Sequence, residues 1–324
     1  MWRLLWELRT SNISIWPERA YDELLLPRRV FGLETLLVSD PAGIQEVLAT
    51  RAVHYRRYMV TPRLLRPVAG DGVLLAEGEA WRQQRRSVSP AFKPANVDRV
   101  LQRFVEAAKH LCARAEAQSR DGSVNLYRLL QTGAIDALGR GLFSLSFDDR
   151  ADRLAAMARA YFAGPGRPNI GDSFARHENQ FRWATWRRRR FERKWFAEID
   201  SVISDWRQAS STAGGAGGVE DIMTVLSRWR DPDSGRPISG HELRHQTATM
   251  IAAGFETTAL AMLWTAFLLG HHQDVQEEIR RELDRNPPGN LQSLKDLERW
   301  PRLREALFEA MRLYPPVAFM SRIA

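Results

Sequence analysis

The longest apolar stretch of the chain lies at residues 250–269, inside a longer run that contains no proline. Ser239 is followed three residues later by Glu242, the pairing of a capping box at the start of a helix. Gly270 stands where a helix C-cap is expected. At 1.5 Å of rise per residue, residues 239–270 predict a helix of roughly 45 Å, long enough to cross a whole domain.

This apolar helix carries one acid, Glu256, which is followed by Thr257 and Thr258. A transmembrane span fits the length, but a carboxylate at its centre is costly. A fully buried core helix explains every feature except the acid. We favour a core helix that lines a reaction cavity, where Ala253 and Gly254 leave room for a flat ligand. Thr257 lies one turn beyond Ala253 on the same face.

The rest of the chain is also mostly helical in pattern, and we expect a mainly α fold with a small β part, without internal repeats. Two short strand-like runs suggest a hairpin, residues 55–72 read as irregular because of their prolines and glycines, and residues 214–218 read as a flexible linker. The strand-like runs are 29–33 and 35–38; the expected helices are 16–26, 41–48, 79–88, 94–143 with a break at 121–122, 150–162, 172–210, 273–285 and 301–313.

The chain has 324 residues, of which 44% are hydrophobic and 27% charged, as expected for one large domain or two smaller ones. Its net charge is +8. The run of arginines at 187–190, with tryptophans nearby, is compatible with a nucleic-acid surface. Such a run is more often the solvated face of an amphipathic helix whose aromatic residues pack inward. We therefore expect no nucleic-acid partner, although a basic face could dock an acidic protein.

Cys112 is the only cysteine, so the chain contains no disulfide framework and no cysteine-based zinc site. This favours a reducing, cytoplasmic location. Residues 1–8 are too short and too interrupted by charge to form a signal peptide or a membrane span. We expect no transmembrane segment.

Two further motifs flank the central helix in the sequence. Trp81 and Arg85 are four residues apart, so an indole N–H and a guanidinium share one helix face and suit an anionic oxygen. Alone, the two would more often form a surface cation–π pair. Glu309 and Arg312 form a helix-face ion pair, a common feature of small energetic value. They are followed by Leu-Tyr-Pro-Pro, which ends the helix and begins an extended run that includes Arg322.

In this order, the early hairpin, W-x-x-x-R, A-G-x-E-T-T and E-x-x-R-L-Y-P-P resemble the cytochrome P-450 family of haem-thiolate monooxygenases over essentially the whole chain. The acid before the threonine and the E-x-x-R-L-Y-P-P form are similar to the microsomal-like branch. The absence of an N-terminal anchor is similar to soluble bacterial members.

The resemblance implies a haem cofactor and a role for each matching residue. Catalytic roles fall to Glu256 and Thr257, the acid–alcohol pair that delivers protons to dioxygen. Trp81, Arg85 and Arg322 match residues that bind the haem propionates. Ala253 and Gly254 match a bend of the helix over the haem, and Glu309 and Arg312 match a structural pair. The implied partners are an apolar small-molecule substrate, dioxygen, and an electron donor of the ferredoxin or flavodoxin type.

The family holds its iron with a cysteine thiolate in a loop well after E-x-x-R. No cysteine follows Arg312, and Cys112 matches no ligand position. We therefore expect residues 1–324 to be a single incomplete domain of this fold, without its C-terminal haem-thiolate segment. The leading interpretation is the larger part of a haem-dependent monooxygenase. The alternatives are a non-catalytic remnant of the family and, third, a basic helical nucleic-acid binder.

Overall fold

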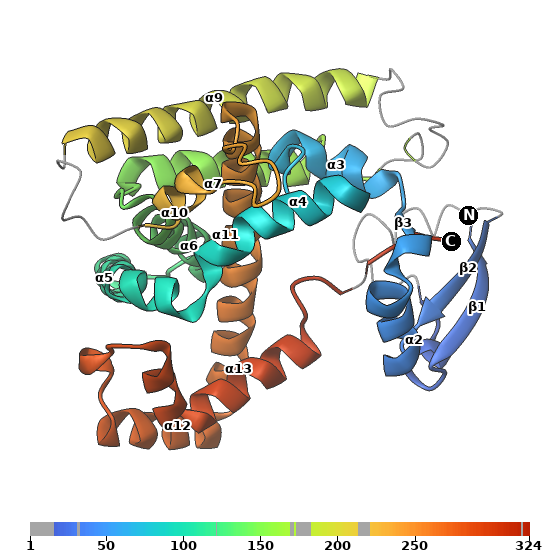
Figure 1. Ribbon diagram of the computed structural model, residues 1–324. Coiled ribbons are helices and arrows are strands. Elements are labelled where there is room, and N and C mark those ends of the chain that lie inside the picture. Colours follow the sequence, from blue (N-terminus) through green and yellow to red (C-terminus); the bar gives the residue numbers. More distant parts are fainter. Residues whose placement is uncertain are drawn as a thin grey trace.

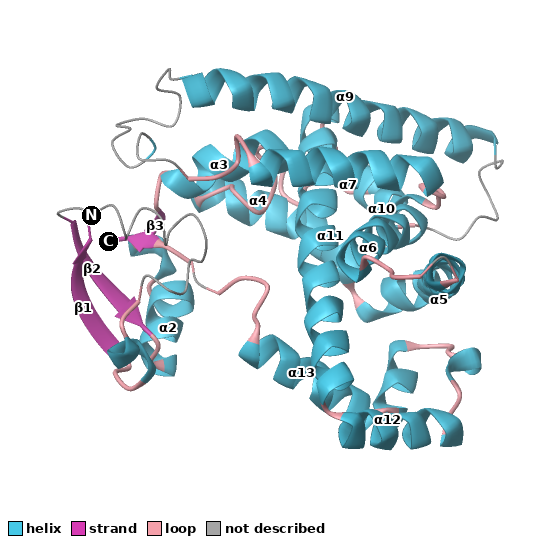
Figure 2. Ribbon diagram, turned by 180° about the vertical axis from the view of Figure 1, so that it is seen from behind, coloured by secondary structure: helices cyan, strands magenta, loops and turns pink. Residues whose placement is uncertain are grey.

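A computed structural model describes residues 16–30, 33–120, 122–168, 172, 183–212, 221–318 and 320–324. Most of these are helical, and the short strands lie together at one side of the molecule (Figure 2), which confirms the mainly α class with a small β part. The predicted N-terminal segment 1–8, the linker 214–218 and residues 173–182 of a predicted helix lie outside these ranges. The longer helices are α2 (Pro41–Gln45, continued by a π-helical turn Glu46–Thr50), α3 (Val60–Ala69), α4 (Gly78–Val88), α5 (Pro94–Ser119), α6 (Leu126–Phe143), α7 (Asp148–Ala163), α9 (Trp183–Thr212), α10 (Ile222–Arg228), α11 (Gly240–His271), α12 (Gln273–Arg285) and α13 (Pro301–Leu313).

Helix α11 runs through the middle of the molecule, with α9 across one end and α12 and α13 at the other (Figure 1). The predicted capping box is confirmed, because Ser239 and Glu242 each accept a hydrogen bond from the other's backbone N–H. The helix ends at His271, and His272, not Gly270, is its C-cap. Contacts with α3, α6, α9, α12 and α13 make α11 the element around which the other helices assemble.

The described part of the chain contains one helix, α11, whose length and apolar composition match those of a membrane span. Of its apolar window, 22% is buried. Its N-terminal half bonds to neighbouring elements through buried polar side chains. Gln246 donates to Gln84 Oε1 (2.8 Å) and accepts from the N–H of Val73 (3.1 Å), and Thr249 donates to the carbonyl of Ala69 (2.7 Å). Such contacts suit a helix that is surrounded by protein at this end.

The capping box leads to a pH-dependent prediction. Hydrogen bonds from Arg236, and then from Ser239, lower the pKa of Glu242 from 4.5 to about 2. Because the folded state holds the charged form, this stabilisation is present above the ordinary pKa and is lost as the pH falls toward 2. Arg236 is half exposed, so solvent screens the pair. We expect Glu242→Gln to lower the free energy of unfolding by about 1 kcal/mol at pH 7.

Urea unfolding at pH 7 and at pH 3 measures this effect, and the difference between wild type and variant should shrink at the lower pH. Glu106→Gln, at an exposed position of α5, is the matched control and should show little effect at either pH. A Glu242→Gln effect of equal size at both pH values would contradict the assignment.

The predicted hairpin is confirmed, with β1 (Leu25–Val30) and β2 (Leu33–Val38) paired antiparallel, but both strands begin earlier than predicted and Leu33 belongs to the second strand. The helix predicted at 16–26 is wrong: only a 3₁₀ turn, Glu18–Tyr21, forms there, and the strand already begins at Leu25. Leu26 is 2% exposed. Burial of this residue and pairing with β2 override the local helical pattern.

The prediction that residues 55–72 are irregular is also wrong, because α3 occupies Val60–Ala69. Pro62 lies in the first turn, where the missing N–H has no intrahelical acceptor. Pro67 lies in the last turn and is buried, so packing against α9 and α11 offsets its cost. Gly70 then ends the helix with φ of 66°, a backbone conformation that favours glycine.

The arginine run on α9 is only partly a solvated face, and that prediction needs correction. Arg188 is 2% exposed and donates two hydrogen bonds, both of 2.7 Å, to the carboxylate of buried Asp172. Arg63 of α3 donates to the same carboxylate (2.9 Å). Trp195 is fully buried as predicted, whereas Trp186 is 46% exposed. A buried carboxylate therefore draws one arginine of the run into the core.

Candidate functional site

One face of α11 combines a small residue with a hydroxyl. Ala253 is exposed and Thr257 is half-buried, although Phe255 and Ala259 of the same helix are fully buried. The Thr257 hydroxyl donates to the carbonyl of Ala253, one turn earlier, at 2.7 Å. The small side chain of Ala253 therefore leaves this face exposed one turn before the hydroxyl.

Gly254 does not share this face. A Cβ on Gly254 would lie 2.9 Å from Leu138 Cδ2 of α6, so the absence of a side chain allows α6 and α11 to pack closely. The chain is α-helical throughout Gly240–His271. The structure thus places Gly254 at a helix–helix contact, so the prediction that it leaves room for a ligand is not supported at this residue.

Glu256 also faces α6. Its Oε1 accepts a hydrogen bond from the Tyr127 hydroxyl (2.6 Å), and its Oε2 accepts one from Gln131 Nε2 (2.5 Å). Burial, followed by the hydrogen bond to Glu256 and its charge, raises the pKa of Tyr127 well above its ordinary value. The acid and Thr257, which were expected to act as a pair, therefore engage different partners in this structure.

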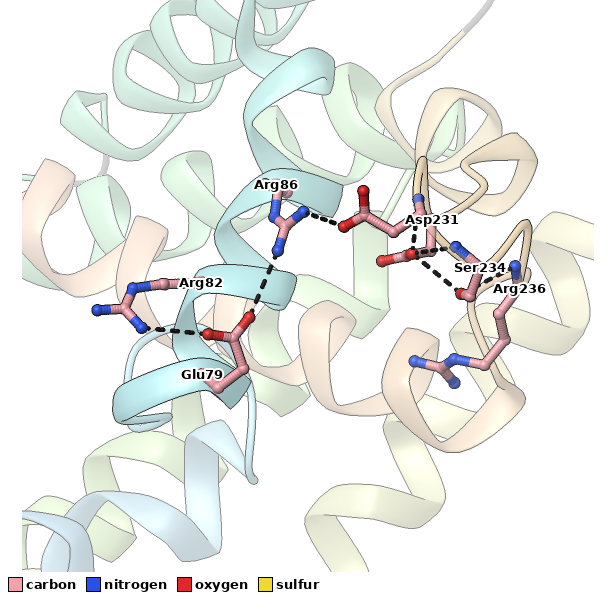
Figure 3. A network of polar contacts seen from close by, with 7 residues as sticks. Glu79, Arg82, Arg86, Asp231, Ser234 and Arg236 are labelled. Carbon is pink, nitrogen blue, oxygen red and sulfur yellow. Dashed lines mark hydrogen bonds and ion pairs between the residues drawn. The ribbon is translucent and has the colours of Figure 1, made fainter.

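Helix α4 presents two unlike faces. Arg82 and Arg86 both pair with Glu79, and Arg86 also reaches Asp233 (2.9 Å) in the turn before α11 (Figure 3). Arg85 is exposed, and no carboxylate among the described residues pairs with it. Trp81, one turn earlier on the same face as Arg85, is 42% exposed. The two predicted donors therefore lie one helical turn apart on α4, and both side chains are exposed.

Arg322 lies in β4 (Arg322–Ile323), which pairs antiparallel with β3 (Arg56–Arg57) so that Arg322 is opposite Arg57. Burial, and then the charge of Arg322, lower the pKa of Arg57. The N–H of Arg57 donates to Glu77 Oε1 (2.7 Å), and Glu77 directly precedes α4. The Arg57 guanidinium also donates to the carbonyl of Ala76 (2.7 Å) and lies 3.5 Å from Glu77 Oε1, so it is already partly engaged near the start of α4.

Glu309 and Arg312 form the expected ion pair on α13, with two hydrogen bonds of 2.6 and 2.8 Å, and both side chains are exposed. Tyr314, which follows α13, also contacts α11. Its ring stacks on Trp264, with centroids 4.1 Å apart and planes at 8°. In the sequence Tyr314 stands only as part of a helix end, and no local pattern signals its contact with Trp264.

Three further residues of the site were missed from the sequence. Arg57 stands in a two-residue strand without a motif, and Tyr127 and Gln131 lie on α6, far from Glu256 in sequence. Only the folded chain brings Tyr127 and Gln131 to the central helix and Arg57 next to Arg322.

A model of the cytochrome P450 family matches residues 29–324, so the chain belongs to the cytochrome P450 family. Cytochrome P450 monooxygenase 128 of Postia placenta is 28% identical to it over 96% of this chain and 61% of the relative. Cytochrome P450 monooxygenase ptmK of Penicillium ochrochloron is 25% identical over 94% of this chain and 62% of the relative. The chain thus spans about three fifths of the length of these two relatives.

Solved structures share the fold. A cytochrome P450 described as CYP102L1 superposes with a TM-score of 0.72 at 21% identity, covering 92% of this chain and 64% of its own. A retinoic acid-bound cyanobacterial CYP120A1 gives a TM-score of 0.72 at 20% identity, covering 98% of this chain and 68% of its own. Both agree with the mainly α architecture around α11.

The family implies a haem iron cofactor. The exposed donors of Trp81 and Arg85, and the guanidinium of Arg322 opposite Arg57, are of the chemical type that binds the negatively charged propionates of such a group. The sole cysteine, Cys112, is exposed on α5 and belongs to neither α4 nor α11. The described residues therefore fit the propionate edge, whereas the thiol lies on a different helix.

Proposed function

We propose that the protein acts as a haem-dependent monooxygenase, which inserts one oxygen atom of dioxygen into an apolar organic substrate. The observation that carries this proposal is the family match over residues 29–324. Relatives whose names include monooxygenase support it. Because the chain spans about three fifths of those relatives, the activity is proposed for the whole protein to which these residues belong.

Each candidate residue has a proposed task. Haem supplies the centre at which dioxygen is activated. Trp81, Arg85 and Arg322 bind the propionates by charge-assisted hydrogen bonds, joined by Arg57, and the small side chain of Ala253 lets α11 approach the ring. A second group of residues acts on protons or on the scaffold: Glu256 and Thr257 move protons toward dioxygen, and Glu309 with Arg312 stabilises the core around the cofactor.

The proposed partners are an apolar small molecule, dioxygen, and an electron donor of the ferredoxin or flavodoxin type. We propose a cytoplasmic location, supported by the single cysteine of the chain. A nucleic-acid partner is not proposed, because Arg188 is bound to Asp172 in the core and so does not contribute to a continuous basic strip.

The test compares the 324-residue chain with the product of the same reading frame, including every codon that follows Ala324. Both are loaded with haem and supplied with reduced ferredoxin or flavodoxin and a panel of apolar substrates. A monooxygenase should form hydroxylated product in the longer form. Absence of product there, or a stop codon directly after Ala324, would favour the non-catalytic alternative.

A spectroscopic prediction concerns the 324-residue chain alone. Since its only thiol is Cys112 on α5, we expect its ferrous haem complex with carbon monoxide to lack the red-shifted band of a thiolate ligand. A difference spectrum of the reconstituted chain measures this. A clear thiolate band that disappears in Cys112→Ser would show that Cys112 ligates iron and would contradict our placement of the motifs.

A further inference from the structure

Glu256 is held by α6 in a way that the acid–alcohol motif alone does not explain. We propose that Tyr127, Gln131 and Arg159 are positioning residues for Glu256, which hold its carboxylate on the α6 side of α11 and so control proton delivery to the Thr257 face. This inference rests on the proposed function. It assigns the contacts that set the resting position of the acid.

The orientation of the Gln131 amide is determined by its two neighbours. Arg159 Nη1 of α7 donates to Gln131 Oε1 (2.8 Å), and Gln131 Nε2 donates to Glu256 Oε2 (2.5 Å). A guanidinium only donates and a carboxylate only accepts, so a reversed amide would lose both bonds. Gln131 is 1% exposed, which leaves no bulk water to replace them. Arg159 therefore acts on Glu256 through Gln131, without touching it.

Both oxygens of the Glu256 carboxylate thus accept hydrogen bonds from α6, and no lysine or arginine among the described residues forms an ion pair with it. Its charge is offset by two neutral donors and by Arg159 behind the amide. Tyr127 remains protonated across the physiological range, because burial and the contact with Glu256 raise its pKa. Tyr127 is therefore a permanent donor that anchors the acid, and it is not itself the source of the proton.

The Thr257 face lies about 100° further round α11. A carboxylate that accepts two hydrogen bonds on the α6 side must release at least one of them before it can carry a proton toward that face. The contacts from α6 and α7 hold the carboxylate in one orientation beside that face, and without them it would adopt orientations from which the proton does not reach Thr257. Loss of an anchor should disturb proton delivery even though none of the three residues lies on the Ala253–Thr257 face.

The first experiment needs no activity. Arg159→Met, Glu256→Gln and the double variant are unfolded in urea, each with Gln131 present and with Gln131→Leu. We expect Arg159→Met and Glu256→Gln to lower the free energy of unfolding by amounts that are not additive. The double variant should therefore unfold near the urea midpoint of the less stable single variant. In the Gln131→Leu background the two effects should become additive. Independent, additive losses with Gln131 present would overturn the network.

The second experiment measures product formed and peroxide released per reducing equivalent in the haem-loaded protein, in H₂O and in D₂O. Arg159→Met should lower the yield of product about tenfold, the effect of one lost hydrogen bond to a charged group, and change the solvent isotope effect. Arg159→Lys, which can still donate to the amide oxygen, should restore most of the yield. In a Glu256→Gln background, Arg159→Met should cause no further loss.

Arg153→Met is the matched control, because Arg153 is an exposed arginine of the same helix, and it should behave as wild type. An unchanged yield and isotope effect in Arg159→Met, despite non-additive unfolding losses, would overturn the positioning role and leave a purely structural network. Wild-type protein that forms no product would overturn the proposed function and, with it, the role in proton delivery. The unfolding experiment would then still decide whether the contacts exist.

Discussion

Arg85→Ala is expected to weaken haem binding by about 10- to 150-fold. A charge-assisted hydrogen bond is worth roughly 1.5–3 kcal/mol, and each 1.4 kcal/mol corresponds to a factor of ten. In the structure Arg85 is exposed and forms no ion pair with any described carboxylate, so its guanidinium pays no cost of breaking an existing contact when it binds a propionate. Haem titration of the purified protein, followed by the rate of haem transfer to an apo-acceptor, measures the effect.

Arg82→Ala is the control for this variant. Arg82 lies on the same helix with the same charge, but its side chain pairs with Glu79 on a different face (Figure 3). Its removal should change haem affinity little. Equal weakening by both variants would indicate a general effect of the positive charge on α4 and would remove Arg85 from the binding site.

The central helix could be predicted from the sequence because its signals are local. The capping box, the absence of proline and the apolar run lie within one continuous segment, and the structure confirms a helix whose C-cap is displaced by two residues, from Gly270 to His272. The start of α4 and the hairpin follow from local patterns in the same way. Helices and hairpins that are determined by neighbouring residues can therefore be predicted from the sequence.

Elements that depend on tertiary packing could not be predicted in this way. Prolines at 62 and 67 indicate an irregular segment, yet burial against α9 and α11 maintains α3. Arg188 reads as a surface residue of an arginine run, yet Asp172 and the packing of α9 bury it. In both cases the structure depends on a contact with residues that are distant in the sequence, which a local pattern does not reveal.

The residues of the candidate site show the same difference between local motifs and tertiary contacts. Residue types such as Trp81 with Arg85 are visible as a motif, because one helix turn brings them together. Which way Glu256 points depends on Tyr127 and Gln131, which stand 129 and 125 positions away in the sequence. The glycine of the same motif likewise faces Leu138 of α6. Sequence spacing indicates that these residues share a helix, whereas the neighbouring helix decides what each one contacts.

Thr257→Ala is expected to divert electrons into hydrogen peroxide and to lower the yield of product per reducing equivalent by at least about tenfold, since positioned proton transfer contributes roughly 10²–10⁴ to such reactions. Cleavage of dioxygen needs protons inside an apolar helix face that excludes most water. A hydroxyl there can hold a water molecule, and that water supplies the proton. In the structure the Thr257 hydroxyl donates to the carbonyl of Ala253, which leaves its oxygen free to accept a hydrogen bond from such a water.

Two further variants separate this role from packing. Thr257→Ser keeps the hydroxyl and loses only a methyl group, so it should retain most of the product yield. Thr258→Ala removes the neighbouring hydroxyl, about 100° round the helix, and should uncouple the reaction less. Product formed and peroxide released per reducing equivalent are measured for all three variants at equal haem content. If Thr257→Ala keeps the wild-type yield, then its bond to Ala253 is the whole role of the hydroxyl, as for many threonines buried in helices, and the protons must reach dioxygen by a route that does not include Thr257.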